Sequence, residues 1–136
     1  MIKETITYED YNGMTRTEDH YFNLSEAELV DMEMSMNGGL SEMVQRIVAS
    51  NDNVELYKIF KDVILKSYGQ KSLDGKKFIK IDERGRKLVD DFVQTEAYSQ
   101  FLMSIVTNAD KAAAFINGVM PKKLMEKAQA GLPMNE

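Results

Sequence analysis

The 136-residue chain contains no cysteine and no tryptophan, only two prolines and a single histidine. Without cysteine it cannot form disulfides, a thiolate nucleophile, or a zinc or iron–sulfur site built on cysteine ligands. The lone histidine, His20, gives little from which to build a metal site or an acid–base pair, and we expect it at a surface position of a strand. This composition suits a protein of a reducing cytoplasm.

Long apolar runs are absent as well. No stretch approaches the roughly 20 residues that a membrane helix needs, and the N-terminus lacks the pattern of a signal peptide, so we expect a soluble, unexported protein without a membrane partner. Lys and Arg total 17 against 22 Asp and Glu, a formal net charge of −5, which disfavours binding to many nucleic-acid phosphates. No nucleophile elbow, zinc-protease, P-loop or EF-hand pattern is present, so neither an enzyme activity nor a cofactor is expected.

Residues 2–22 predict a β-hairpin. β-Branched and aromatic residues are dense there, and Asn12-Gly13 is a dipeptide favoured at the centre of two-residue type I′ loops. Such a loop sets a register in which Glu9 lies opposite Arg16. A lone hairpin is marginally stable in water, so this one must pack on the rest of the chain or pair with another strand or another copy.

The sequence from about residue 25 to 121 has mainly helical periodicity. It begins with a capping box, in which Ser25 and Glu28 satisfy each other's backbone N–H groups. Gly69 is expected to end the third helix, and Asp74-Gly75 to mark a loop or a small second hairpin. The expected helices cover about residues 25–36, 40–48, 54–68, 82–93, 95–106 and 109–117.

These elements predict one α+β domain over residues 1–121, an N-terminal hairpin followed by an irregular bundle of about six short helices. Residues 122–136 form a polar tail that we expect to be partly helical or disordered.

The methionines cluster in the first two predicted helices. Helical spacing cannot place all of them on one buried stripe, and methionine repacks readily against varied apolar partners. Loose filling of the core is the competing interpretation. Our hypothesis is a groove that faces a partner or a second copy, formed by Leu29, Met32, Met36, Met43 and Ile47.

A basic loop stands out in the acidic chain. It contains Lys71, Lys76, Lys77 and Lys80 around Phe78. Such a loop is usually solvated, but it could contact a nucleic-acid backbone or dock on an acidic stretch of a protein partner or neighbouring subunit.

A series of short blocks resembles a known family over about residues 3–121. They follow the Asn12-Gly13 hairpin in the order YFNLS (21–25), EMS (33–35), GGLSEM (38–43), ILKSYG (64–69), DGKKFIK (74–80), QTEAYS (94–99) and AAFINGVMP (113–121). In this order they resemble the tail assembly chaperones of bacteriophages with long, non-contractile tails.

The resemblance implies a non-enzymatic protein of the host cytoplasm that binds the apolar, helical tape measure protein until the tail tube polymerises around it. The resemblance also implies that the protein is absent from the finished virion and that several copies act on one tape measure. In such families a ribosomal frameshift often adds a C-terminal extension that recruits the tail tube protein. The competing hypotheses are a regulatory protein that binds nucleic acid through the loop of residues 71–80, and a structural tail-completion protein.

Overall fold

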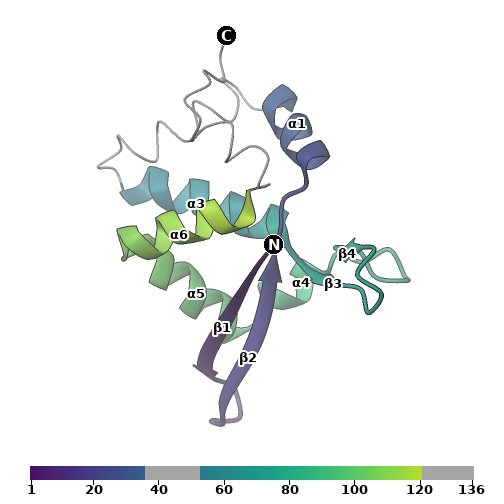
Figure 1. The fold of residues 1–136 in the computed structure, drawn as a ribbon. Helices are drawn as coiled ribbons and strands as arrows, with labels where there is room; N and C mark the ends of the chain where they lie inside the picture. The colour runs from purple at the N-terminus through teal and green to yellow at the C-terminus, as the bar shows by residue number, and fades with distance from the viewer. Residues whose placement is uncertain (36–52, 121–136) are drawn as a thin grey trace.

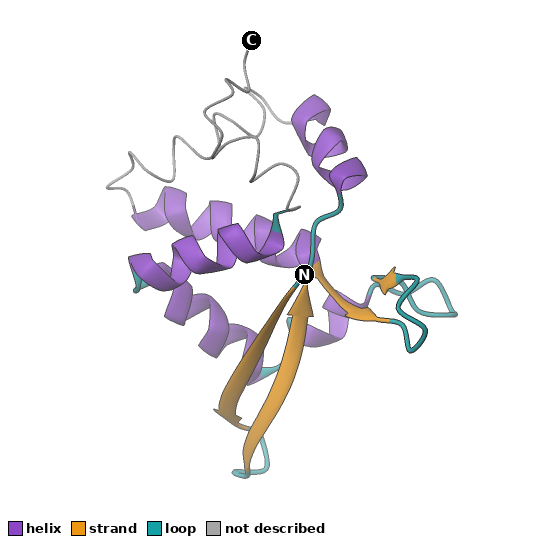
Figure 2. Cartoon of the chain, in the orientation of Figure 1, coloured by secondary structure: helices purple, strands orange, loops and turns teal. Residues whose placement is uncertain are grey.

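The computed structural model describes residues 1–35 and 53–120 and confirms the α+β class. Within these residues four strands form one antiparallel sheet in the order β1-β2-β3-β4, accompanied by five helices (Figure 1, Figure 2). The helix expected over residues 40–48 and the tail of residues 122–136 lie outside the described residues. The elements are β1 (Ile2–Glu9), β2 (Thr15–Phe22), α1 (Glu26–Ser35), α3 (Asn53–Ser67), β3 (Tyr68–Lys71), β4 (Phe78–Ile79), α4 (Leu88–Phe92), α5 (Glu96–Val106) and α6 (Ala109–Val119).

The N-terminal hairpin is confirmed, but its predicted register is wrong by one residue. Tyr8, and not Glu9, lies opposite Arg16. The cause is Asp10, whose Oδ1 accepts hydrogen bonds from the backbone N–H groups of the second and fourth residues after it, both at 2.9 Å. The loop therefore spans residues 10–14, and Gly13 takes a φ of 79°.

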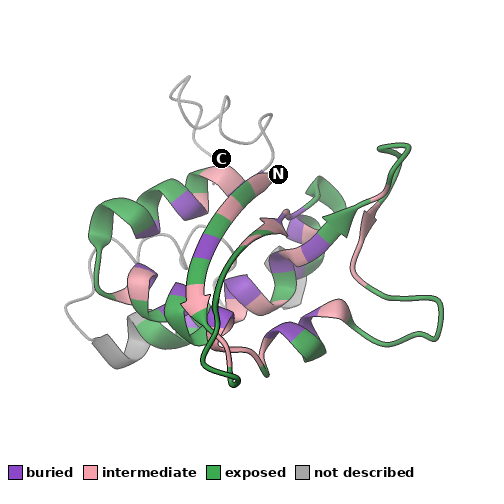
Figure 3. Ribbon diagram, turned by 90° about the horizontal axis from the view of Figure 1, so that it is seen from below, coloured by how far each residue is buried: buried purple, intermediate pink, exposed green. Residues whose placement is uncertain are grey.

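The even-numbered residues of the hairpin face the helices. Ile6 and Phe22 are buried there, while the odd-numbered residues of β1 are exposed, an alternation visible along β1 in Figure 3. The Phe22 ring stacks on Phe101 of α5 at 5.1 Å between centroids and meets Phe115 of α6 edge-on at 5.3 Å. Each such aromatic pair adds about 0.5–1.5 kcal/mol beyond its buried area, so these rings fix the hairpin on the helices.

Helix starts are the best-predicted local features. In the confirmed capping box the Ser25 N–H donates to Glu28 Oε1 at 2.9 Å, and the Glu28 N–H donates to Ser25 Oγ at 3.1 Å. Thr95 caps α5 after the break expected near residue 94, and Asn108 caps α6. None of the described helices has the length and apolarity to cross a membrane.

Gly69 does not end a helix as predicted. α3 ends at Ser67, and Gly69 lies in β3, where a Cβ would approach the Ile79 carbonyl oxygen to 2.6 Å and collide with the Phe78 ring. A glycine here allows β3 and β4 to pair closely. The small second hairpin that they form is therefore confirmed.

The helix predicted from Asp82 begins only at Leu88. Residues 82–86 instead form a second loop like that of the first hairpin: Asp82 Oδ1 accepts from the Arg84 and Arg86 N–H groups at 2.9 Å, and Gly85 takes a φ of 79°. This loop closes a single bridge between Ile81 and Lys87.

Candidate partner-binding site

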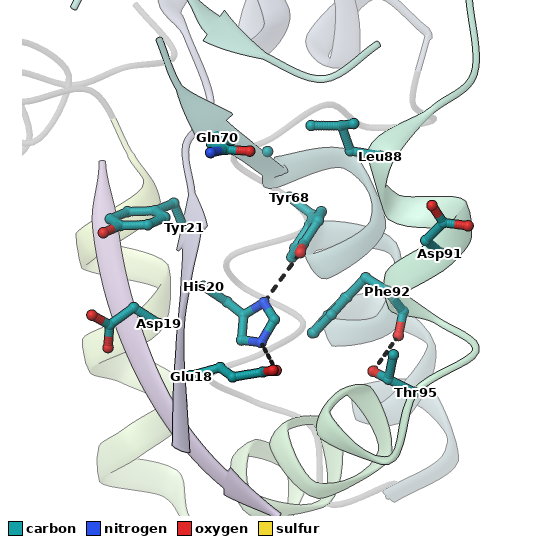
Figure 4. A pocket seen from close by; sticks show the side chains of 11 residues that line it. Glu18, Asp19, His20, Tyr21, Tyr68, Gln70, Leu88, Asp91, Phe92 and Thr95 are labelled. Carbon is teal, nitrogen blue, oxygen red and sulfur yellow. Dashed lines mark hydrogen bonds and ion pairs between the residues drawn. The ribbon is translucent and has the colours of Figure 1, made fainter. Parts of the chain in front are cut away.

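A pocket of about 510 Å³ opens between β2, β3 and α4 (Figure 4). It exists because β3 follows β2 for two pairs, Tyr21 with Gly69 and Phe22 with Tyr68, and then turns away to pair with β4. The part of β2 that precedes Tyr21 has no strand partner on this side among the described residues. Strand β2 and helix α4 thus form two walls of an open groove.

Aromatic rings form the inner surface of the pocket. Tyr68 of β3 stacks on Phe92 of α4 with 4.2 Å between centroids and 10° between planes, and His20 of β2 lies 4.8 Å from the Phe92 ring. The Tyr68 hydroxyl and His20 Nδ1 are 3.1 Å apart (Figure 4). The expected surface position of His20 is wrong: its side chain is 13% exposed, because the alternation of the strand places it on the inner face with Phe22.

Burial dominates the electrostatics of these rings. It lowers the pKa of His20 against the opposing effect of Glu18, so the imidazole is neutral at pH 7. The Glu18 carboxylate lies 3.5 Å from Nε2, which favours a proton on Nε2 and leaves Nδ1 to accept from the Tyr68 hydroxyl. Burial also raises the pKa of Tyr68 to about 12, so its hydroxyl stays protonated.

The rim of the pocket is acidic. Glu18, Asp19 and Asp91 line it, and within residues 1–35 and 53–120 the lining includes no lysine or arginine. Glu18 accepts from the Tyr8 hydroxyl and Asp19 from the Thr5 hydroxyl, both at 2.7 Å. The pocket thus fits a cationic or mixed apolar and cationic segment better than a phosphate.

A second groove of about 490 Å³ runs between α3, α4 and the start of α5. Its apolar lining consists of Leu65, Val89, Val93 and Tyr98, with lysines and aspartates at its margin. The Tyr98 hydroxyl is buried and has no hydrogen-bond partner in the structure. A buried hydroxyl without a partner is unfavourable, and a ligand in the groove that hydrogen-bonds to it would remove this cost. The groove thus offers this polar group beside its apolar surface.

Three of the four lysines of the predicted basic loop are exposed to solvent. The fourth, Lys80, is engaged in contacts within the chain. Lys71, Lys76 and Lys77 surround the turn between β3 and β4. Lys80 instead forms an ion pair with Glu28 at 2.5 Å and donates to the Lys66 carbonyl at 2.8 Å. It connects α1, the end of α3 and β4.

Two members of the predicted methionine groove can be placed. Leu29 and Met32 are only 4% and 5% exposed and belong to the hydrophobic core. Met36, Met43 and Ile47 lie outside the described residues. In this conformation Leu29 and Met32 are therefore closed to a partner.

The residues that shape the pocket were not predicted from the sequence. Tyr68 lies at the end of the helix predicted over residues 54–68 and Phe92 in the helix predicted over residues 82–93, although the spacing of Glu18, His20 and Phe22 places these three on one side of a strand. Across the two described segments no group of three or more His, Asp or Glu side chains is arranged to hold a metal ion.

Comparison with known proteins adds one match. A family model described as phage tail assembly chaperone matches residues 1–135, nearly the whole chain. No curated protein and no solved structure matches it.

Proposed function

The chain belongs to the phage tail assembly chaperone family, and from this premise we propose that it binds the tape measure protein of a phage tail and keeps it soluble until the tail tube forms. The observation that carries the proposal is the extent of the family match, residues 1–135. A tape measure exposes long apolar helical stripes before assembly, and such surfaces aggregate unless they are covered.

The groove between α3 and α4 is the described surface that best suits such a client. An amphipathic helix places apolar anchors along one face and charges at its edges. Leu65, Val93 and Tyr98 offer an apolar floor, and the margin carries charges of both signs. We assign this groove to the first contact with the tape measure.

The methionine groove remains a separate proposal. Leu29 and Met32 would have to leave the core to meet a client, whereas Met36, Met43 and Ile47 extend the same sequence pattern outside the described residues. We propose that the last three contribute to client binding or to contacts between copies.

Co-expression with the tape measure protein encoded by the same phage tests the function. The expected result is that soluble tape measure increases and co-purifies with the chain. If it precipitates both with this chain and with any frameshifted longer form, the tape measure proposal is wrong and a retained virion component becomes the better hypothesis, which mass spectrometry of purified particles would detect.

Matched variants distinguish the two client surfaces. Leu65→Asp with Val93→Asp should abolish co-purification if the α3–α4 groove binds the client. Val30→Asp with Met103→Asp is the control, since these side chains are 52% and 51% exposed and lie outside that groove. Circular dichroism must show that each variant is folded.

The methionine surface needs its own pair. Met36→Ser with Met43→Ser should lower the yield of soluble tape measure if these side chains contact it. Met14→Ser with Met103→Ser, which alters two exposed methionines, is the control. Unchanged yield in both pairs would remove this surface from the proposal.

We further propose that the protein acts in the host cytoplasm, leaves before the virion is complete, and recruits the tail tube protein through a longer frameshifted form. In this proposal residues 1–121 are the folded domain and residues 122–136 the region where an extension joins. Immunoblotting of infected cells and of purified virions, with antibodies to residues 1–121, tests both the longer product and its absence from particles.

A further inference from the structure

The loop between β3 and β4 is an exposed, preformed protrusion. Its Leu73 side chain is fully exposed. Asp74 holds the turn by accepting from Ser72 Oγ at 2.7 Å and from the Lys76 N–H at 3.0 Å, and the Ser72 N–H closes it by donating to the Lys77 carbonyl at 2.9 Å. An apolar side chain at the tip of an ordered loop loses little conformational entropy on binding, which favours its use as an anchor.

The charge of the loop complements that of the pocket between β2 and α4. Lys71, Lys76 and Lys77 are exposed on the loop. Among the described residues the pocket lining has three carboxylates and no lysine or arginine, and aromatic rings lie beneath it. Arg86 lies 3.6 Å from Asp91 and Arg16 3.8 Å from Glu18, outside the lining, whereas Asp19 has no ion pair within the described part of the chain. An apolar tip flanked by lysines therefore matches an apolar floor flanked by carboxylates.

The loop and the pocket are also neighbours on one face. Gln70, which lines the pocket, directly precedes Lys71 at the start of the loop. When two complementary features lie side by side on one surface, a two-fold axis between two copies lets each copy donate its loop and receive the other's. The two contacts form together, so neither surface is left uncovered.

We propose that two copies of the chain associate through reciprocal insertion of this loop. Leu73 of each copy covers the half-buried Tyr68 ring of the other, and the loop lysines face Asp19 and Asp91. The pairing does not involve the tape measure, so its test and that of the proposed function can fail separately.

Charge exchange between two variants tests the pairing. Lys76→Glu with Lys77→Glu makes the loop acidic, and Asp19→Lys with Asp91→Lys makes the pocket rim basic. Each variant alone juxtaposes like charges, so sedimentation equilibrium should show dimer association at least about tenfold weaker than that of the unaltered chain. Mixed in equal amounts, the two variants should recover association, because each loop then meets a pocket of opposite charge.

The control reverses two charges away from the contact. Lys58→Glu with Lys61→Glu, on α3, leaves the loop and the pocket rim unchanged and should retain the dimer. Leu73→Ser should weaken association without altering the melting temperature of the monomer, because the side chain is solvent-exposed there.

Three results would overturn the pairing. The first is an unaltered chain that stays monomeric up to about 1 mM, where even a weak specific contact is populated. The second is association that survives both charge reversals. The third is failure of the mixed variants to associate although each melts cooperatively.

Discussion

The two β-hairpins of this fold are held in place by different means. The long hairpin, β1–β2, packs its inner face on α5 and α6 through Ile6 and Phe22. The short hairpin, β3–β4, pairs over two residue pairs and depends on the close approach at Gly69 and on the bonds of Lys80. Broad burial supports the first hairpin, whereas a few specific contacts support the second and leave its loop free for a partner.

The largest expected effect breaks the short hairpin. Gly69→Ala places a methyl group 2.6 Å from the Ile79 carbonyl oxygen, which is backbone and cannot rotate away. We expect a loss of about 3 kcal/mol in the free energy of unfolding, the upper end for overpacking, with distortion of the pocket. Urea denaturation measures the loss.

Gly118→Ala is the matched change at the long hairpin. Its methyl group would lie 2.9 Å from Ile2 Cβ, which is attached to the backbone, but alanine is favoured over glycine inside α6 by about 1 kcal/mol and offsets part of this clash. The variant should therefore lose about 1 kcal/mol less in the free energy of unfolding than Gly69→Ala. Equal destabilisation by the two substitutions would contradict the proposed difference between the hairpins.

A smaller effect compares the two aspartate loops. Asp10→Ala removes the acceptor for two backbone N–H groups and the 2.6 Å ion pair with Arg16, at the end of a long ladder. Asp82→Ala removes the same two bonds from a loop that closes one bridge. The melting temperature should fall more for Asp10→Ala; asparagine at either position, which keeps an acceptor oxygen, is the control.

Acid should weaken the joint between the hairpins, where His20 meets Tyr68. Burial lowers the pKa of His20 in the folded chain below its usual 6.5. At a pH between the folded and the unfolded pKa, the unfolded chain therefore binds more protons than the folded one. The free energy of unfolding should therefore fall as the pH drops below about 6.5. Denaturation of His20→Gln between pH 7 and 5 should give a flatter profile; an equal slope would assign the change to other groups.

The smallest expected effects come from removing one hydroxyl. Tyr68→Phe loses the hydrogen bond to His20 and should cost about 1 kcal/mol. Tyr98→Phe removes a buried hydroxyl that has no partner among the described residues and should be neutral or stabilising by up to about 1 kcal/mol. Urea denaturation of the two variants side by side tests the opposite signs.

Local chemistry was readable from the sequence and gave the hairpin, the capping box and most helix starts. Two of the errors, the register of the first hairpin and the start of the helix predicted from Asp82, share a local cause that could have been recognised. Asp10-Tyr-Asn-Gly13 and Asp82-Glu-Arg-Gly85 have the same Asp-x-x-Gly pattern, and in both the aspartate captures two backbone N–H groups. A register predicted from Asn12-Gly13 alone is therefore wrong by one residue in the first loop, and the second loop was not predicted.

The pocket could not be predicted in the same way. It depends on β3 leaving β2 after two residue pairs and on α4 lying opposite, and both follow from contacts between residues about 25 to 70 positions apart. The sequence identified the basic loop but gave no indication that an acidic groove lies beside it. That the loop and the groove are neighbours can be seen only in the folded structure.

Ile2, Leu24 and the end of α6 meet at one place. The Ile2 side chain packs against Gly118, and the Leu24 N–H donates to the Val119 carbonyl at 3.0 Å. A segment joined after Met120 therefore departs beside the first residues of β1, at the opposite end of that strand from the loop of residues 10–14. A short-range photo-crosslinker near Ile2 should therefore capture a protein bound close to Met120 more readily than the same group placed in the loop of residues 10–14.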